Sequence, residues 1–269
     1  MKGHLRKMQR DPGPEPRYHL PVGDARLEIN DYLGKTFTLR YTNEIQCIGC
    51  GRLTKKSFNQ GYCYPCFAGL AACDICIVKP ERCHYAAGTC REPEWAQQHC
   101  FQTHYVYLAN TSGLKVGITR ASQIPTRWID QGAVAAMKLL RVSSRLLAGK
   151  AEVILAAHVK DKTDWRRMLS GPPAAVDLAQ AGLDLLAQCD AELSALVKNH
   201  EPGAITRMEQ PDITTIEYPV ITYPDKVRSL NLDKEPRVTG ILQGIKGQYL
   251  LLDTGVINIR KYGGYVVEI

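Results

Sequence analysis

Two Cys-x-x-Cys pairs constrain the fold of this 269-residue chain more than any other feature. The pairs are Cys47–Cys50 and Cys63–Cys66, and twelve residues separate them. Each pair can present two thiolates to one tetrahedral Zn²⁺ at a Zn–S distance of roughly 2.3 Å. Glycine and proline beside the pairs, as in Gly61 and Pro65, favour the tight turns of a metal knuckle. We therefore expect Cys47, Cys50, Cys63 and Cys66 to bind one zinc ion.

A second cluster of cysteines follows before residue 101. Four ligands complete a closed structural zinc site. The expected set is Cys76, Cys83, Cys90 and Cys100, with Cys73 or His104 as substitutes. Four cysteines serve an iron–sulfur cluster equally well, and buried free thiols are a further alternative, so both stay open.

The start of the chain and its apolar content bear on its location. The basic stretch 1–7 is not followed by an apolar core, so we expect no secretory signal. Paired cysteines without such a signal indicate a reducing cytoplasm, where thiols bind metals. No run of 18 apolar residues occurs, so we expect no membrane partner. The amino-acid sequence does not indicate an oligomeric state.

The order of patterns predicts an α+β fold with five segments. The cysteine-rich part is poor in apolar periodicity, so ligation more than a core must hold it together. Strand-like alternation precedes it and returns near the C-terminus, and we find no internal repeat. The predicted segments are an N-terminal β segment (1–46), a zinc-binding segment (47–100), a small α/β domain (101–170), a helical connector (171–204) and a C-terminal β unit (205–269).

Segment 101–170 begins with a predicted hairpin, in which strands 105–109 and 114–119 flank a turn at 110–113. A helix is expected after Pro125, with Trp128, Ala135 and Leu139 near one face. Further helices are expected at 149–160 and from 174 to 197.

Positive charge is concentrated in this same segment. Residues 101–170 hold eleven Lys and Arg against four acids, an excess equal to the net charge of the whole chain. Residues 171–269 hold nine basic and thirteen acidic residues. A cationic segment beside zinc knuckles is typical of proteins that bind nucleic acid, although solvated helix faces would give the same count.

The predicted hairpin carries the pattern Tyr105-Val-Tyr107 on its first strand and Lys115-Val-Gly117 on its second. This arrangement resembles the two-strand signature of the GIY-YIG nuclease superfamily. In that superfamily an arginine on the next helix and a glutamate on a later helix complete the site, and Arg127 and Glu152 match these positions. The sequence departs from the pattern at Lys115, which replaces a tyrosine, and at Tyr105, which replaces a glycine.

The chain as a whole also resembles a bacterial family of unknown function. The shared features are a cysteine-rich stretch followed by four short motifs at residues 104–108, 115–120, 127–133 and 163–169. That likeness covers nearly the full length but implies no activity.

The GIY-YIG resemblance implies a catalytic set of Tyr107, Lys115, Arg127 and Glu152. Glu152 is the only acid between Asp130 and Asp161, and its oxygens are ligands that Mg²⁺ or Mn²⁺ accepts. Arg127 can bind a scissile phosphate through its planar guanidinium. The resemblance implies that Tyr107 positions or deprotonates the attacking water. Arg120, Arg141 and Trp165 are the expected substrate-binding residues, through phosphate contacts and base stacking.

Three functions remain as hypotheses. The first is an endonuclease dependent on Mg²⁺ or Mn²⁺, which cleaves phosphodiester bonds of DNA or RNA while zinc modules place the substrate. The second is a non-catalytic zinc protein that binds nucleic acid on a degenerate nuclease scaffold. The third is a protein–protein adaptor that docks through its acidic C-terminal part.

Overall fold

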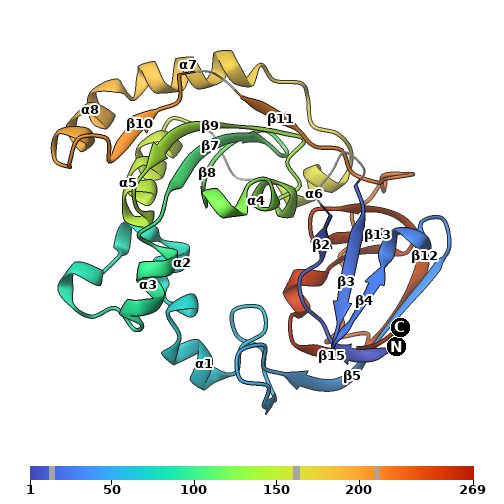
Figure 1. The fold of residues 1–269 in the computed structure, drawn as a ribbon. Coiled ribbons are helices and arrows are strands. Elements are labelled where there is room, and N and C mark those ends of the chain that lie inside the picture. Colours follow the sequence, from blue (N-terminus) through green and yellow to red (C-terminus); the bar gives the residue numbers. More distant parts are fainter. Residues whose placement is uncertain (12–15, 160–163, 210–211) are drawn as a thin grey trace. The chain divides into compact units, whose positions relative to one another are not determined.

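The computed structural model of the chain describes residues 1–11, 16–159, 164–209 and 212–269 (Figure 1). Two predictions reach beyond these ranges, because Lys160 of a predicted helix and Thr163 of a quoted motif lie outside the described residues. The contacts form two compact units in place of the five consecutive segments expected. Unit 1 comprises residues 1–69, 169–171 and 217–269, and unit 2 comprises residues 70–168 and 172–216.

Unit 1 is built mainly of antiparallel strands from both ends of the chain. Its principal sheet has the order β1-β15-β5-β12-β13-β14, with the short β6 beside β5, and a second sheet has the order β2-β3-β4. The elements are β1 (Lys2–His4), β2 (Gln9–Arg10), β3 (Tyr18–Val22), β4 (Ala25–Glu28), β5 (Thr36–Gln46), β6 (Leu53–Thr54), α1 (Tyr64–Gly69), β12 (Arg237–Lys246), β13 (Tyr249–Leu252), β14 (Gly255–Asn258) and β15 (Tyr265–Glu268). The N-terminal strands thus complete the C-terminal β unit.

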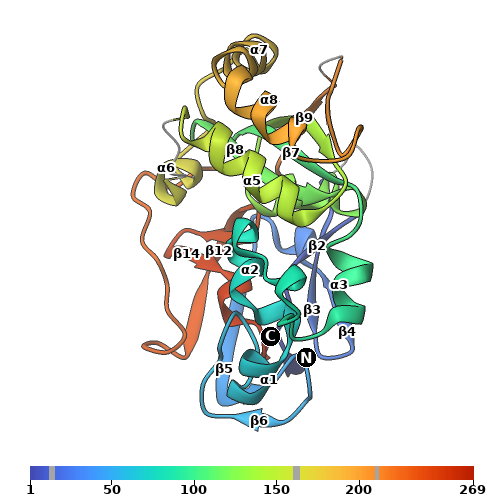
Figure 2. The ribbon, with the colours of Figure 1, turned by 90° about the vertical axis from the view of Figure 1, so that its left-hand side faces the viewer.

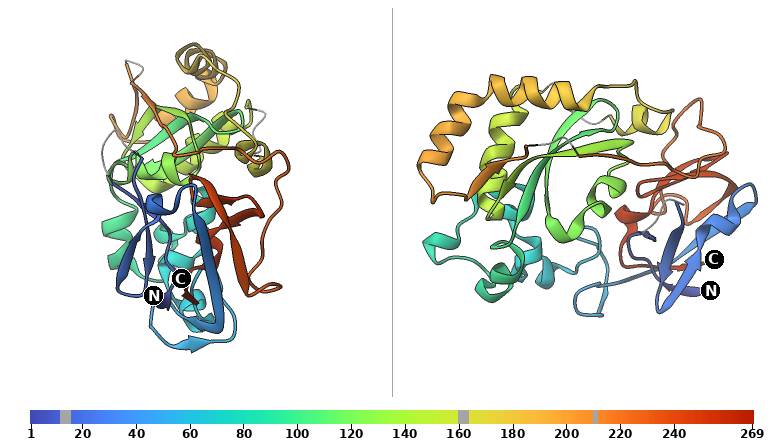
Figure 3. Two further views of the ribbon diagram at one scale, coloured as in Figure 1. Left: turned by 90° about the vertical axis from the view of Figure 1, so that its right-hand side faces the viewer. Right: turned by 45° about the horizontal axis from the view of Figure 1, so that its top comes forward.

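The two chain ends lie side by side in this unit (Figure 3). The Met1 amino group donates a hydrogen bond of 2.8 Å to the Ile269 carbonyl, and β1 pairs with β15. Alternation along β5 and β12 places residues such as Phe37, Leu39 and Val238 in the core.

Unit 1 contains a structural repeat that the sequence analysis missed. The run β3, β4, the 3₁₀ turn η1 (Ile29–Tyr32) and β5 recurs as β13, β14, η6 (Ile259–Tyr262) and β15. Ile29 corresponds to Ile259 and Tyr32 to Tyr262. Gly34 and Gly264 follow at matching places with φ of 73° and 84°, a region that favours glycine.

Unit 2 centres on a five-stranded antiparallel sheet of order β10-β9-β7-β8, with β11 also beside β9. The predicted hairpin is confirmed, because β7 pairs in register with β8 from His104↔Arg120 to Asn110↔Leu114. The strands are β7 (His104–Asn110), β8 (Leu114–Arg120), β9 (Ala135–Val142), β10 (Ile205–Arg207) and β11 (Ile213–Thr215). The helices are α2 (Ile75–Val78), α3 (Pro93–His99), α4 (Thr126–Asp130), α5 (Arg145–Ala156), α6 (Trp165–Leu169), α7 (Leu178–Gln188) and α8 (Asp190–Lys198).

One face of this sheet packs against helices. Figure 2 shows α5 against β7, β8 and β9, with α7 and α8 further along. The core between them includes Val106, Val116, Leu139, Leu155 and Leu185. Ser144 caps α5, because its hydroxyl accepts a hydrogen bond from the backbone N–H of Leu147.

The helix predicted after Pro125 is wrong in its extent. It ends at Asp130, and residues 135–142 form the strand β9 between β7 and β10. Trp128 therefore does not share a helical face with Ala135 and Leu139.

Candidate functional site

The four cysteines of the two Cys-x-x-Cys pairs come together in unit 1. Their sulfur atoms all lie within 4.8 Å of one another, and the Sγ atoms of Cys50 and Cys63 are 3.7 Å apart. Cys47 directly follows β5, and Cys63 and Cys66 lie at the start of α1. This set can hold a metal ion, because adjacent ligands of a tetrahedral Zn²⁺ with thiolate bonds of about 2.3 Å are separated by roughly 3.8 Å.

Backbone N–H groups stabilise negative charge on a sulfur atom of this cluster. The backbone N–H groups of Gly49 and Cys63 donate to Cys47 Sγ at 3.4 and 3.2 Å. Burial opposes ionisation of Cys47, but these N–H groups outweigh it and lower its pKa to about 6. Burial and the neighbouring thiols raise the pKa of Cys66 to about 12. Four thiols this close need a cation before all can ionise.

Two further residues fit the knuckle. Gly61 has φ of 139°, and a Cβ there would lie 2.8 Å from Ile48 Cδ1, so a side chain would displace the first knuckle. The Arg52 side chain hydrogen-bonds Cys50, and the charges of Cys50 and Cys63 raise the pKa of its guanidinium. Arg52 thus offsets the charge of a metal–thiolate group.

The predicted second set of cysteines is less compact. Burial raises the pKa of Cys76 to about 12, and the charges of Asp74, Cys83 and Cys100 add to this. Burial also raises the pKa of Cys100, and the charges of Cys83 and Cys90 raise it further. The charges of these thiols therefore act on one another within unit 2. Among the described residues, however, the groups with ligand atoms within 4.8 Å do not include these four, and Cys76 is grouped with Asp74 and His84 instead.

His104, a proposed substitute ligand, is fully buried at the start of β7. Its Nδ1 lies 2.7 Å from the Gln102 carbonyl, and its buried Nε2 has no hydrogen-bond partner. A lone pair on Nε2 is the form of histidine that binds metals. Burial, with the charges of Arg145 and Arg120, lowers its pKa to about 4, so the ring is neutral. Cys73 is buried at the end of the 3₁₀ turn Ala71–Cys73.

A third group of charged residues surrounds Glu152 on α5. The carboxylate is half-buried, and the charges of Arg127, Lys115 and Arg145 act on it. Burial raises the pKa of Glu152, while these three cations oppose the rise. They come from α4, β8 and the first residue of α5, so two of the three cations lie on elements other than the helix of Glu152. Three of them, Lys115, Arg127 and Glu152, belong to the predicted catalytic set.

The spacing on α5 explains why a cysteine-rich loop lies beside Glu152. Arg145, Gly149 and Glu152 are spaced i, i+4 and i+7, so they share one face of the helix. The 3₁₀ turn η3 (Pro80–Arg82) covers this face, because a Cβ at Gly149 would lie 2.6 Å from Pro80 Cβ and 2.7 Å from the Glu81 nitrogen. The charge of Glu81 in turn raises the pKa of Glu152.

Arg145 and Glu81 were missed by the sequence reasoning. Arg145 Nη2 donates to the Ile77 carbonyl at 2.6 Å, and the charges of Cys100 and Cys76 act on its guanidinium. Burial lowers its pKa. The spacing of Arg145 and Glu152 on one helix was visible in the sequence. The docking of residues 80–82 was not.

Tyr107 has a different environment from the one expected. Its side chain is fully buried, its ring is 5.9 Å from that of Trp128, and its hydroxyl donates to Gln131 Oε1 at 2.6 Å. A Cβ at Gly117 would lie 2.5 Å from this hydroxyl, so the cross-strand glycine leaves room for it. Tyr107 and Lys115 lie on the same face of the hairpin, since Tyr107 pairs with Gly117 and Ala109 with Lys115.

The predicted substrate-binding residues are dispersed over unit 2. Arg120 ends β8, and its charge acts on both Cys100 and Arg145. Arg141 is exposed on β9, opposite Tyr105 and Thr206. Trp165 is half-buried on α6, where the Arg166 guanidinium lies 4.3 Å from its ring. The charge of Arg120 acts on Arg145, which in turn acts on Glu152.

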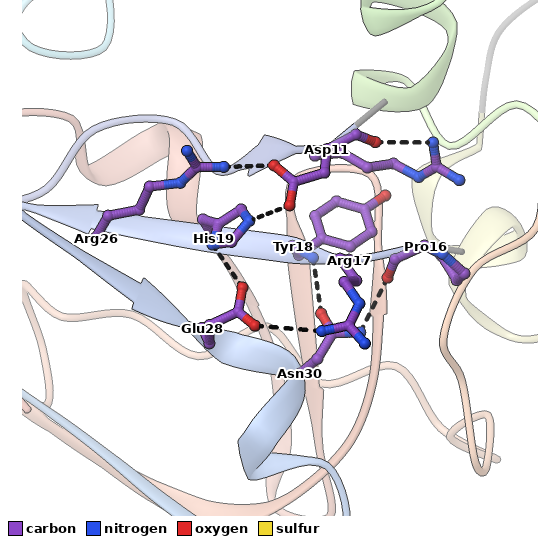
Figure 4. Close-up of polar contacts among 9 residues, drawn as sticks. Asp11, Pro16, Arg17, Tyr18, His19, Arg26, Glu28 and Asn30 are labelled. Carbon is purple, nitrogen blue, oxygen red and sulfur yellow. Dashed lines mark hydrogen bonds and ion pairs between the residues drawn. The ribbon is translucent and has the colours of Figure 1, made fainter. Parts of the chain in front are cut away.

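A further cluster in unit 1 also has ligand-type residues, Asp11, His19 and Glu28. Figure 4 shows His19 between Asp11 and Glu28. Nε2 of His19 lies 2.7 Å from Asp11, and Nδ1 lies 2.9 Å from Glu28. One ligand atom of each residue lies within 4.8 Å of the others, and the two carboxylates contact different nitrogens of the ring. Donation to both requires an imidazolium. The hydrogen bond from His19 is the main reason that the pKa of Asp11 is lowered.

Comparison with known proteins adds a family but no activity. No helix among the described residues is long and apolar enough to cross a membrane. No curated protein and no solved structure matches the chain. The family described as "Protein of unknown function (DUF2797)" matches residues 34–267. This match spans most of the length, from β5 to β15, so the chain belongs to the DUF2797 family.

Proposed function

We propose that this protein acts on nucleic acid as a divalent-metal-dependent endonuclease, with its site at Glu152. One observation carries the proposal. Glu152 is a half-buried carboxylate on which the charges of Arg127, Lys115 and Arg145 act, and Arg127 and Lys115 come from α4 and β8, outside the helix of Glu152. Structural ion pairs also perturb carboxylates, but the convergence of residues matching the GIY-YIG pattern favours a site.

The chemistry of phosphodiester cleavage matches these groups. Negative charge on the phosphoryl oxygens grows as water attacks the phosphorus, and Arg127 and Lys115 can stabilise it. The oxygens of Glu152, with Glu81 nearby, are the ligands that would hold Mg²⁺ or Mn²⁺. Such an ion, when bound, supplies a Lewis acid and lowers the pKa of a bound water.

Tyr107 has a positioning role in this proposal. Its hydroxyl is bound to Gln131, and Gln131 directly follows the helix that carries Arg127. The hydrogen bond therefore fixes the end of α4 against β7. Direct action of Tyr107 on the attacking water, which the resemblance implies, stays a prediction.

The second candidate is nucleic-acid binding without cleavage. Two observations favour it, since Lys115 replaces a hydroxyl of the GIY-YIG pattern and the remaining tyrosine is buried. A lysine acts as a general base only when its pKa is depressed. The cationic groups would still bind phosphates in this case.

We further propose that the cluster of Cys47, Cys50, Cys63 and Cys66 holds a structural zinc ion. All ten cysteines are free thiols, and these four lie at ligand distance from one another. Such thiols persist in a reducing compartment, so we place the protein in the cytoplasm.

The test is cleavage of labelled single- and double-stranded DNA and RNA with Mg²⁺ or Mn²⁺. We expect Glu152→Gln and Arg127→Ala to lower the rate at least about 100-fold, as for loss of a transition-state contact. Glu201→Gln, an exposed carboxylate of the same unit, is the matched control and should cleave like the parent chain.

Binding of the same probes separates the two candidates. Salt-dependent binding with no cleavage under any metal would leave only the second. Cleavage that is equal in the parent, Glu152→Gln and Arg127→Ala would show a different site or a contaminant, and would refute the proposal.

A further inference from the structure

A group of ligand-type residues in unit 2 lies apart from both the cysteine clusters and Glu152. His158 follows α5, Cys189 joins α7 to α8, and Glu192 is in the first turn of α8. One ligand atom of each lies within 4.8 Å of the others. Nε2 of His158 is 3.5 Å from Oε2 of Glu192. Figure 1 shows α5 and α8 adjacent at this end of the unit, and their contacts agree.

The three side chains lie at different depths below the protein surface. Cys189 is fully buried and belongs to the hydrophobic core, and its Sγ is 4.0 Å from the Ile154 carbonyl. Above it, 28% of the His158 side chain and 57% of the Glu192 side chain are exposed. A cation can therefore enter from solvent and rest on the sulfur between an imidazole and a carboxylate.

The distances suit a transition metal. With metal–sulfur and metal–nitrogen bonds of about 2.3 and 2.0 Å, tetrahedral neighbours are separated by roughly 3.3–3.6 Å. The 3.5 Å separation of His158 Nε2 and Glu192 Oε2 is in this range, and the Cys189 sulfur lies within 4.8 Å of both ligand atoms.

An ion pair accounts for only part of this group. A His158–Glu192 pair on the surface explains two of the three residues, and such exposed pairs contribute little. It does not explain why a buried thiol lies within 4.8 Å of both side chains. One bound cation would engage all three residues, because a thiol coordinates a metal as the thiolate.

We propose that His158, Cys189 and Glu192 bind one zinc-class divalent cation that fastens the end of α5 to the α7–α8 corner. A sulfur, nitrogen and oxygen set selects Zn²⁺ over Mg²⁺ or Ca²⁺. Three protein ligands leave a fourth position for water. His158 also lines a groove of about 410 Å³, together with Asp184 and Gln188. The site is independent of the proposed endonuclease chemistry.

The experiment measures zinc per chain in the full-length protein, equilibrated with buffers of fixed free Zn²⁺. We expect His158→Ala, Glu192→Ala and Cys189→Ala each to lose one equivalent at a free Zn²⁺ level where the parent is saturated. His158 and Glu192 are exposed, so their variants should fold even if the buried Cys189→Ala does not. Asp184→Asn, which alters the same groove but no ligand, should keep the equivalent.

Cobalt provides a second readout. Sulfur-to-cobalt charge-transfer absorption should fall in Cys189→Ala, and the ligand-field bands should shift in His158→Ala. Equal zinc content in the parent and in both exposed variants at every free Zn²⁺ level would overturn the proposal.

Discussion

Glu152 is half-buried among positively charged side chains, so its ionisation makes the stability of the fold depend on pH. In the folded chain, burial raises its pKa above the unfolded value despite Arg127, Lys115 and Arg145. The folded state therefore holds the proton more tightly, and stability falls as pH rises from the unfolded pKa of about 4.3 through the raised value. A glutamine at this position has no proton to lose.

We predict that Glu152→Gln gains stability over the parent as pH rises from the unfolded pKa of about 4.3 through the raised folded pKa, because the glutamate ionises over that interval. Urea unfolding, without added divalent metal, measures the difference. The three tryptophans Trp95, Trp128 and Trp165 all lie in unit 2, so their fluorescence follows the unit that contains Glu152. Glu201→Gln should show no such trend. A constant offset between Glu152→Gln and the parent at all pH values would contradict the assignment.

Residue spacing in the sequence predicted the first cysteine cluster and part of the group around Glu152, but not the remaining residues of that group. Two Cys-x-x-Cys pairs were enough to predict the first cluster, because local turns bring each pair together and one ion joins them. Glu152 and Arg127 followed from a pattern of elements. Glu81 and Arg145 did not, since their place beside Glu152 depends on the docking of residues 80–82 against α5.

At the scale of elements, alternation predicted strands well and apolar runs poorly. The hairpin 104–120 alternates around a Ser112-Gly113 turn, and the structure confirms it. Residues 135–142 are rich in alanine and leucine, which favour helix, yet they form β9. Burial between β7 and β10 overrides the local preference there, because pairing with neighbours on both edges satisfies the backbone.

The turn η3 closely approaches α5 at Gly149, so adding one methyl group there tests the contact. In Gly149→Ala the new Cβ meets Pro80 Cβ and the Glu81 backbone, neither of which is the end of a flexible chain. We expect a loss of about 1–3 kcal/mol in unfolding free energy from overpacking, against a gain of about 1 kcal/mol in helix propensity. Urea unfolding by tryptophan fluorescence measures the net loss.

A second glycine in unit 2 controls for the substitution itself. Gly113, in the β7–β8 turn, has nothing within 4 Å of its added Cβ. Gly113→Ala should stay within about 0.5 kcal/mol of the parent, as surface changes usually do. If Gly149→Ala were instead more stable than Gly113→Ala, the turn Pro80–Arg82 would not rest on α5 in solution.

At the scale of the whole molecule, chain order was a poor guide to the units. The predicted zinc segment 47–100 divides after Gly69, so the two cysteine clusters belong to different units. Unit 1 joins β1 to β15 and β5 to β12 across most of the chain length. Pairing between such distant strands has no local sequence signal. The repeat of β3–β5 in β13–β15 escaped notice because its few matching residues are embedded in polar turns.

This division predicts the effect of removing one thiolate from the first cluster. Cys63 is buried, and its Sγ lies 3.7 Å from that of Cys50, so Cys63→Ser should lose one zinc per chain. Loss of a structural metal removes folding free energy locally, and we expect weaker amide-exchange protection in β6 and α1. The tryptophan emission of unit 2 should be unchanged, because none of the three indoles lies in unit 1. Ser57→Ala, in the same loop, should retain the metal. Full zinc content in Cys63→Ser, with unaltered exchange at residues 47–66, would exclude the cluster as a metal site.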